Sequence, residues 1–77
     1  MKVIVDIPYD IGTKIKCIFR NVWFTGVVEF YRYKFVIRVL DGEYYFSDIH
    51  NGLDKDGNKI DYIYLSSVMN YANIVIL

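Results

Sequence analysis

The stretch that decides the fold is residues 22–46, "VWFTGVVEFYRYKFVIRVLDGEYYF". Apolar and polar residues alternate along it with a period of two, which is typical of a β-strand whose two faces meet different surroundings. We expect one strand at Val22–Tyr31, a tight connection near Tyr31-Arg32, and a second strand at Tyr33–Leu40. Gly26 lies inside the first strand, where a glycine indicates a sharp bend or a closely passing backbone. The Asp41-Gly42 pair is typical of a hairpin turn leading into a strand at residues 43–47.

The same alternation extends to both sides of this stretch. A strand is expected at Val3–Ile7, because Pro8 lacks the amide that a ladder needs, and another at residues 14–20, followed by a turn at Arg20-Asn21. Downstream, "HNGLDKDGNKIDY" reads as a long hairpin or exposed loop that pivots at Asp56-Gly57. Strand character resumes in "YIYLSS", Ser66 or Ser67 caps a single helical turn, and "NIVIL" forms the last strand.

Composition supports an all-β domain. Ile, Val, Tyr, Phe and Trp together account for 34 of 77 residues, whereas Ala occurs once and Gln never. This length fits one domain over residues 1–77. The formal net charge is zero, so a nucleic-acid or membrane partner is not indicated by charge overall. With a single cysteine and no apolar run near the ~20 residues of a membrane helix, we expect a soluble cytoplasmic protein without a disulfide.

The order of these segments resembles the SH3-like barrels and, within them, the Tudor group. The likeness rests on "GTKIKCIF", "VWFTGVV" and "FVIRVLDGEYYFSDI", followed by a one-turn element and a short final strand. It implies a small barrel of five to six antiparallel strands with one short helical turn near the C-terminal end. Tudor domains bind methylated lysine or arginine in an aromatic cage. Only Phe19 and Phe24 match cage positions here, so packing of these rings in the barrel interior is the favoured interpretation.

Residues suited to catalysis or metal binding are few. Asp54, Asp56 and Asn58 match the first positions of a calcium loop, but Lys59 replaces the required glycine, and Leu65 replaces the final glutamate. His50 is the single histidine, and we expect it in an exposed loop. Cys17 alternates onto the apolar side of its strand and is expected to be buried. We therefore predict no catalytic residues, no metal site, no cofactor and no enzyme activity.

The remaining signal is a surplus of aromatic residues near positive charge. The expected interior set is Phe24, Val28, Phe30, Phe35, Ile37 and Val39, although alternation alone leaves the register across residues 31–34 open. Trp23, Tyr31, Tyr33, Tyr44 and Tyr62 exceed what so small a barrel can enclose, and exposed Tyr and Trp are enriched at interface hot spots. The predicted binding residues combine these rings with neighbouring cations: Trp23, Tyr31, Arg32, Tyr33, Lys34, Arg38, Tyr44 and Tyr62.

Two hypotheses of function follow. The first is a non-catalytic module that binds another protein through an aromatic-rich face or an open barrel edge, as the small size, the surplus aromatic residues and the missing catalytic groups indicate. Because "IPYDIG" resembles small proteins of phages and mobile elements, and the Ile-, Asn-, Lys- and Tyr-rich composition resembles low-GC coding, the expected partner is a bacterial host protein. The second is a protein that binds nucleic acid or a phosphorylated nucleotide signal through the basic aromatic patch. The apolar last strand also predicts a homodimer, because an open apolar edge favours pairing with another chain.

Overall fold

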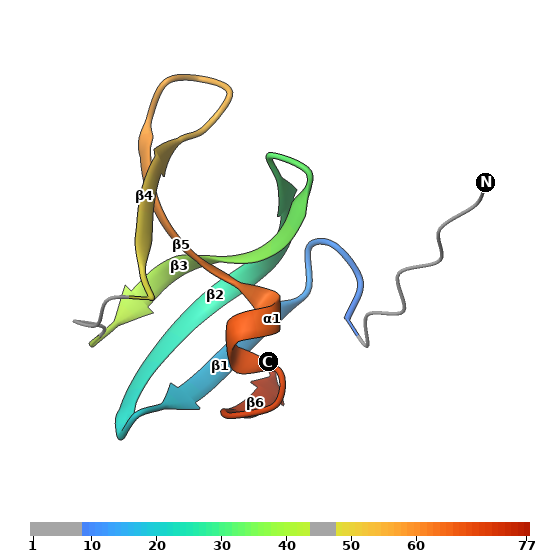
Figure 1. Ribbon diagram of the computed structural model, residues 1–77, viewed down its shortest axis with the longest axis vertical. Coiled ribbons are helices and arrows are strands. Elements are labelled where there is room, and N and C mark those ends of the chain that lie inside the picture. Colours follow the sequence, from blue (N-terminus) through green and yellow to red (C-terminus); the bar gives the residue numbers. More distant parts are fainter. Residues whose placement is uncertain (1–8, 44–47) are drawn as a thin grey trace.

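The computed structural model describes residues 9–43 and 48–77. Its strands are β1 (Lys14–Phe19), β2 (Val22–Tyr31), β3 (Lys34–Gly42), β4 (His50–Leu53), β5 (Lys59–Tyr64) and β6 (Asn73–Ile76), with one helix, α1 (Leu65–Val68) (Figure 1). All pairings are antiparallel, in the order β4-β5-β3-β2-β1-β6. The all-β class with one helical turn is thus confirmed. Among the described residues no pairing joins β4 to β6, so the sheet does not close into the expected barrel.

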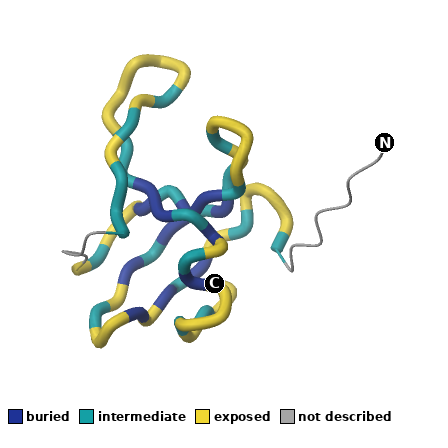
Figure 2. Tube along the Cα trace, viewed as in Figure 1, coloured by how far each residue is buried: buried dark blue, intermediate teal, exposed yellow. Residues whose placement is uncertain are grey.

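The hydrophobic core lies on one face of β1, β2, β3 and β5 and is covered by α1. Ile15, Cys17 and Phe19 alternate onto this face of β1, as their spacing predicted. Leu65 and Val68 place the buried side of α1 against it (Figure 2). The interior set is right for Phe24, Val28, Ile37 and Val39 and wrong for Phe30, which is 51% exposed. Phe30 lies near the end of β2, where its ring meets the edge of the half-buried Phe35.

Two turns of two residues set the register of β1, β2 and β3. Arg20 and Asn21 have φ angles of 54° and 64°, and Arg32 and Tyr33 have 48° and 67°. Positive φ at both central residues is the signature of the tight hairpin turn that matches strand twist. The turn of the second hairpin is therefore Arg32-Tyr33, one residue later than the predicted Tyr31-Arg32, and Tyr31 pairs with Lys34.

Gly26 has the close backbone neighbour that its place in a strand predicted. The register of β2 against β3 shifts between Thr25, opposite Asp41, and Gly26, opposite Val39, so Leu40 is an extra residue that forms a bulge in β3 beside Gly26. A side chain at Gly26 would meet Ile37 Cγ2 and would lie 2.7 Å from the Arg38 carbonyl oxygen. The absence of a side chain lets β2 and β3 cross closely at the bend.

Three local predictions need correction. Asp41 and Gly42 do not form a hairpin turn, because both still pair with β2, opposite Thr25 and Phe24. Neither Ser66 nor Ser67 caps α1, since Tyr64 occupies the cap position and no side chain bonds to the helix start. The predicted strand at 3–7 lies outside the described residues, as does the predicted strand at 43–47 apart from Glu43. Within the described residues, no helix is long and apolar enough to span a membrane.

Candidate binding surface

The structure brings four of the predicted binding residues together in the β2–β3 hairpin: Tyr31, Arg32, Tyr33 and Lys34. Arg38 and Tyr62 lie farther from the hairpin tip, directly opposite each other on β3 and β5. Trp23 lies at the other end of β2, where Lys16 Nζ sits 5.2 Å from its ring centre. Tyr44 is outside the described residues. Of the predicted binding residues that the structure describes, all except Trp23 therefore lie on neighbouring parts of the β2–β3 hairpin and β5.

Cross-strand pairing explains why aromatic side chains gather beside this hairpin. Residues directly opposite in a ladder share a face, and β5 places Tyr62 opposite both Arg38 and His50. The ring of Tyr62 lies 4.8 Å from that of Tyr31 and 5.4 Å from that of His50. The His50 ring is also 4.8 Å from the ring of Tyr64. Tyr31, His50, Tyr62 and Tyr64 thus form an aromatic cluster that joins the two hairpins of the sheet.

The Tyr31 hydroxyl fixes the position of this cluster against β4. It donates a hydrogen bond of 2.9 Å to the Leu53 carbonyl oxygen and accepts one of 3.2 Å from the Leu53 amide. At Gly52 an added Cβ would lie 2.5 Å from that hydroxyl, so the glycine leaves room for the contact. Tyr31 therefore connects the β2–β3 hairpin to the β4–β5 hairpin through main-chain atoms.

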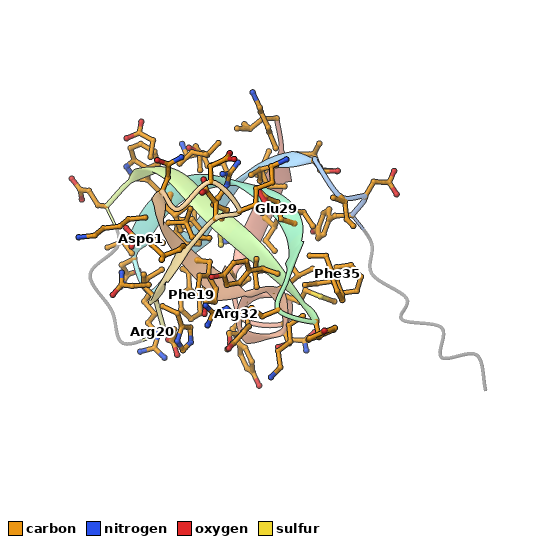
Figure 3. The ribbon with its side chains drawn as sticks, turned by 90° about the horizontal axis from the view of Figure 1, so that it is seen from above. Phe19, Arg20, Glu29, Arg32, Phe35 and Asp61 are labelled. Atoms are coloured by element: carbon orange, nitrogen blue, oxygen red, sulfur yellow. The ribbon has the colours of Figure 1, made fainter. Side chains whose placement is uncertain are left out.

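Two cations lie on faces of the cluster. The Arg32 guanidinium is 5.2 Å from the centre of the Tyr31 ring, and Lys34 Nζ is 4.8 Å from the centre of the Tyr64 ring. Both distances are within the range of cation–π attraction. The nearby carboxylate of Glu29 pairs with Arg38 Nε at 2.7 Å, and in Figure 3 it lies apart from Arg32. Positive charge at the hairpin tip is therefore presented on aromatic rings.

Tyr33 is the most exposed aromatic residue at this end of the molecule. Its side chain is 93% exposed, and its backbone φ of 67° places it in the left-handed region. That region is unfavourable for a residue with a bulky side chain and is usually occupied by Gly or Asn in such turns. We define the hairpin surface as Tyr31, Arg32, Tyr33, Lys34 and Tyr64.

Tyr62 and His50 differ from their expected exposure. Tyr62 was expected outside but is only 7% exposed, because the rings of Tyr31 and His50 lie against it. Burial accordingly raises the pKa of its hydroxyl. His50 was expected in an exposed loop, yet it begins β4 and is half-buried in the aromatic cluster. Tyr64 was missed among the predicted binding residues, although the period of two in "DYIYL" places it on the same face of the strand as Tyr62.

The other residues considered for chemistry lie in the hydrophobic core or in a turn. Phe19 and Phe24 are buried in the core, as favoured over an aromatic cage. The Asp54 carboxylate accepts hydrogen bonds of 2.9 Å from the amides of Asp56 and Asn58, which makes a polar turn and lowers the pKa of Asp54. No group of three or more metal-ligating side chains occurs within residues 9–43 and 48–77. Burial raises the pKa of the Cys17 thiol to about 11.

Comparisons with known proteins do not assign the chain to a family: no family model matches it, and no significantly similar curated protein or solved structure was found.

Proposed function

We propose that this protein is a non-catalytic binding module that attaches to a partner protein through the hairpin surface. The observation that carries the proposal is Tyr33, a fully presented aromatic side chain held in an unfavourable backbone conformation. Unfavourable local conformations concentrate at functional sites, where they fix the direction of a side chain. Tyr and Arg are also among the residues most enriched at the centres of interfaces.

The support beneath the hairpin surface adds to this proposal. The Tyr31 ring, which carries Arg32, is bonded to the main chain of β4 and packs against Tyr62. The Tyr64 ring, which carries Lys34, packs against His50 and Tyr62, so both rings are held in place. A surface whose side chains are ordered before binding loses less conformational entropy when a partner docks. The hairpin surface is thus suited to a partner with complementary acidic and apolar groups.

Finer parts of the proposal rest on the sequence and the topology. Composition supports a phage or mobile-element factor whose partner is a bacterial host protein, and the single buried thiol is compatible with a reducing cytoplasm.

The turn of α1 directly before β6, which then pairs with β1, supports an SH3-like arrangement with β4 as an added edge strand. An experimental structure that includes residues 1–8 and 44–47 tests this arrangement. A flat sheet without barrel-like curvature would contradict it.

The test of the binding role is a comparison of two exposed tyrosines. A partner captured with the wild-type chain is purified, and its Kd is measured against Tyr33→Ala and Tyr71→Ala. Tyr71 is the matched control because it is 77% exposed and follows α1, away from the hairpin surface in the sequence. We expect at least a tenfold weaker Kd, about 1.4 kcal/mol, for Tyr33→Ala and no change for Tyr71→Ala. Equal effects of the two variants would argue against this site.

A second candidate function is favoured by the two cations on tyrosine faces. Rings that stack on bases beside cations that meet phosphates are the arrangement used for single-stranded nucleic acid and for nucleotides. Binding of this kind weakens steeply with salt, because counterions are released from the phosphates. Titration of a fluorescent oligonucleotide into wild type and into Arg32→Ala/Lys34→Ala at two salt concentrations tests it. A Kd that changes neither with salt concentration nor with the two substitutions would argue against nucleic-acid or nucleotide binding at this surface.

A further inference from the structure

One side of β6 faces no other described strand. In the part of the chain that the structure describes, β6 lies at the end of the sheet and pairs with β1 alone. Among residues 9–43 and 48–77, no segment pairs with its other side. An unpaired strand edge presents a row of free amides and carbonyls that can template the addition of another strand.

The register with β1 identifies which groups are free. The Leu77 amide donates a 2.9 Å hydrogen bond to the Lys14 carbonyl oxygen, so this pair is a hydrogen-bonded one. Hydrogen-bonded and non-bonded pairs alternate along an antiparallel ladder. Val75, opposite Lys16, and Asn73, opposite Ile18, therefore also bond to β1. The amides and carbonyls of Ile74 and Ile76 point to the free side.

The side chains of this edge are apolar and exposed. Val75 is 52% exposed, Ile76 62% and Leu77 67%. Ile74 packs partly against the hydrophobic core, and Ile76 shares its face of the strand. None of the four residues of β6, "NIVI", carries a charge. The edge thus lacks the lysines and prolines by which proteins usually prevent strand addition.

We propose that β6 pairs antiparallel with β6 of a second copy of this chain, about a two-fold axis at Val75. In this register Val75 lies opposite Val75 of the second copy, and Ile74 lies opposite Ile76. Ile74 and Ile76 then exchange amide-to-carbonyl hydrogen bonds across the axis, on both sides of Val75. All four free main-chain groups of each strand are satisfied. A two-fold axis at Ile74 or Ile76 would satisfy only part of them.

The side chains agree with this register. The exposed Ile76 of each copy lies beside the half-buried Ile74 of the other, so each core gains an apolar neighbour. The two Val75 side chains meet at a non-hydrogen-bonded pair, where opposite side chains are closest. Because β6 is uncharged, no like charges meet across the axis. Pairing unites two six-stranded sheets into one continuous sheet.

Cysteine placement tests the register directly. Cα atoms of a non-hydrogen-bonded antiparallel pair are roughly 4.5 Å apart, which suits a disulfide. We expect Val75→Cys to form a disulfide-linked dimer under mild oxidation. Asn73→Cys is the matched control, because residue 73 would lie opposite Leu77 of the second copy. Both positions are exposed, and the native Cys17 is buried and does not compete.

Measurements on the wild type complete the test. Light scattering should give about twice the 9.1 kDa chain mass at high concentration, and Val75→Lys should give the monomer mass. Amide exchange at Ile74 and Ile76 should slow as concentration rises. A Val75→Cys chain that stays monomeric, or equal cross-linking of Asn73→Cys, would overturn the proposal. Exchange that is slow at every concentration would also overturn it, since it indicates that residues of the same chain cover the edge.

Discussion

Among single residues, Tyr33 has a backbone conformation that glycine usually occupies. Gly26 and Gly52 leave room for neighbouring atoms, and Gly57 turns the β4–β5 loop with a φ of 83°. Tyr33 adopts a similar φ of 67° without the benefit of being a glycine. This contrast is why Tyr33, rather than the larger but partly covered Trp23, is the centre of the proposed site.

Gly26→Ala should strongly destabilise the fold. Its Cβ would lie 2.7 Å from a main-chain oxygen of Arg38, and main-chain atoms of a paired strand cannot move aside easily. We expect a loss of about 1 to 3 kcal/mol in the free energy of unfolding, measured by urea denaturation. Thr25→Ala, one residue away and half-exposed, is the control and should cost less than about 1 kcal/mol. Similar losses for both variants would show that the close crossing is not the cause.

Cys17 should make stability fall at alkaline pH. Its folded pKa of about 11 exceeds the ordinary value of 9.0, so between these values the unfolded chain loses the thiol proton and the folded chain keeps it. The free energy of unfolding therefore decreases as pH rises from about 9 to about 11, by roughly 2 kcal/mol. Cys17→Ala should be less stable near neutral pH but flatter over this window. Parallel curves of the free energy of unfolding against pH for wild type and Cys17→Ala would contradict a raised pKa of the buried thiol.

At the level of elements, we expect the Arg32-Tyr33 turn to favour binding at the expense of stability. Asn and Gly accept positive φ far better than Arg and Tyr, so Arg32→Asn/Tyr33→Gly should raise the free energy of unfolding by about 1 to 2 kcal/mol. The same variant should lose partner binding. Asn21→Gly in the other turn, whose φ is 64°, is the control for turn chemistry and should leave binding unchanged. A variant that is more stable and still binds would place the site elsewhere.

The contact of Tyr31 with β4 gives a second prediction at this scale. Tyr31→Phe removes both hydrogen bonds to Leu53 and should lower the free energy of unfolding by about 1 kcal/mol. Amide exchange in β4 should accelerate more than exchange in β1. Tyr33→Phe, whose side chain is 93% exposed, should change neither quantity. Uniform acceleration across the sheet would mean that Tyr31 does not hold β4 in particular.

Sequence patterns identified most elements because alternation and turn residues act locally. β1, β2, β5, β6 and the single helical turn follow from period-two patterns and short apolar runs. The pairing of Asp41 and Gly42 with β2 was missed, because an Asp-Gly pair also fits the end of a strand. Tyr62 and His50 were misjudged because the rings that cover them are distant in sequence: Tyr31 and His50 lie against Tyr62, and Tyr62 and Tyr64 lie against His50. Side-chain burial at the candidate site depends on such long-range contacts, which alternation cannot reveal.

In the whole molecule, the hairpin surface and the free edge of β6 lie on different parts of the sheet. The hairpin surface belongs to β2, β3 and β5, whereas the free edge belongs to β6, with β1 between β6 and β2 (Figure 1). A dimer formed through β6 would therefore leave both hairpin surfaces uncovered. Two such surfaces on one assembly raise the effective affinity for a partner that is itself multivalent.

Site-specific photo-crosslinking can show whether a protein partner docks on the hairpin surface. A photoreactive phenylalanine analogue replaces Tyr33 in one chain and Tyr71 in another, and adducts formed in bacterial cells are identified by mass spectrometry. We expect one protein adduct at position 33 that excess wild-type chain suppresses and excess Tyr33→Ala chain does not, with no such adduct at position 71. The account would be contradicted by nucleic acid as the sole adduct at position 33, or by the same proteins at both positions.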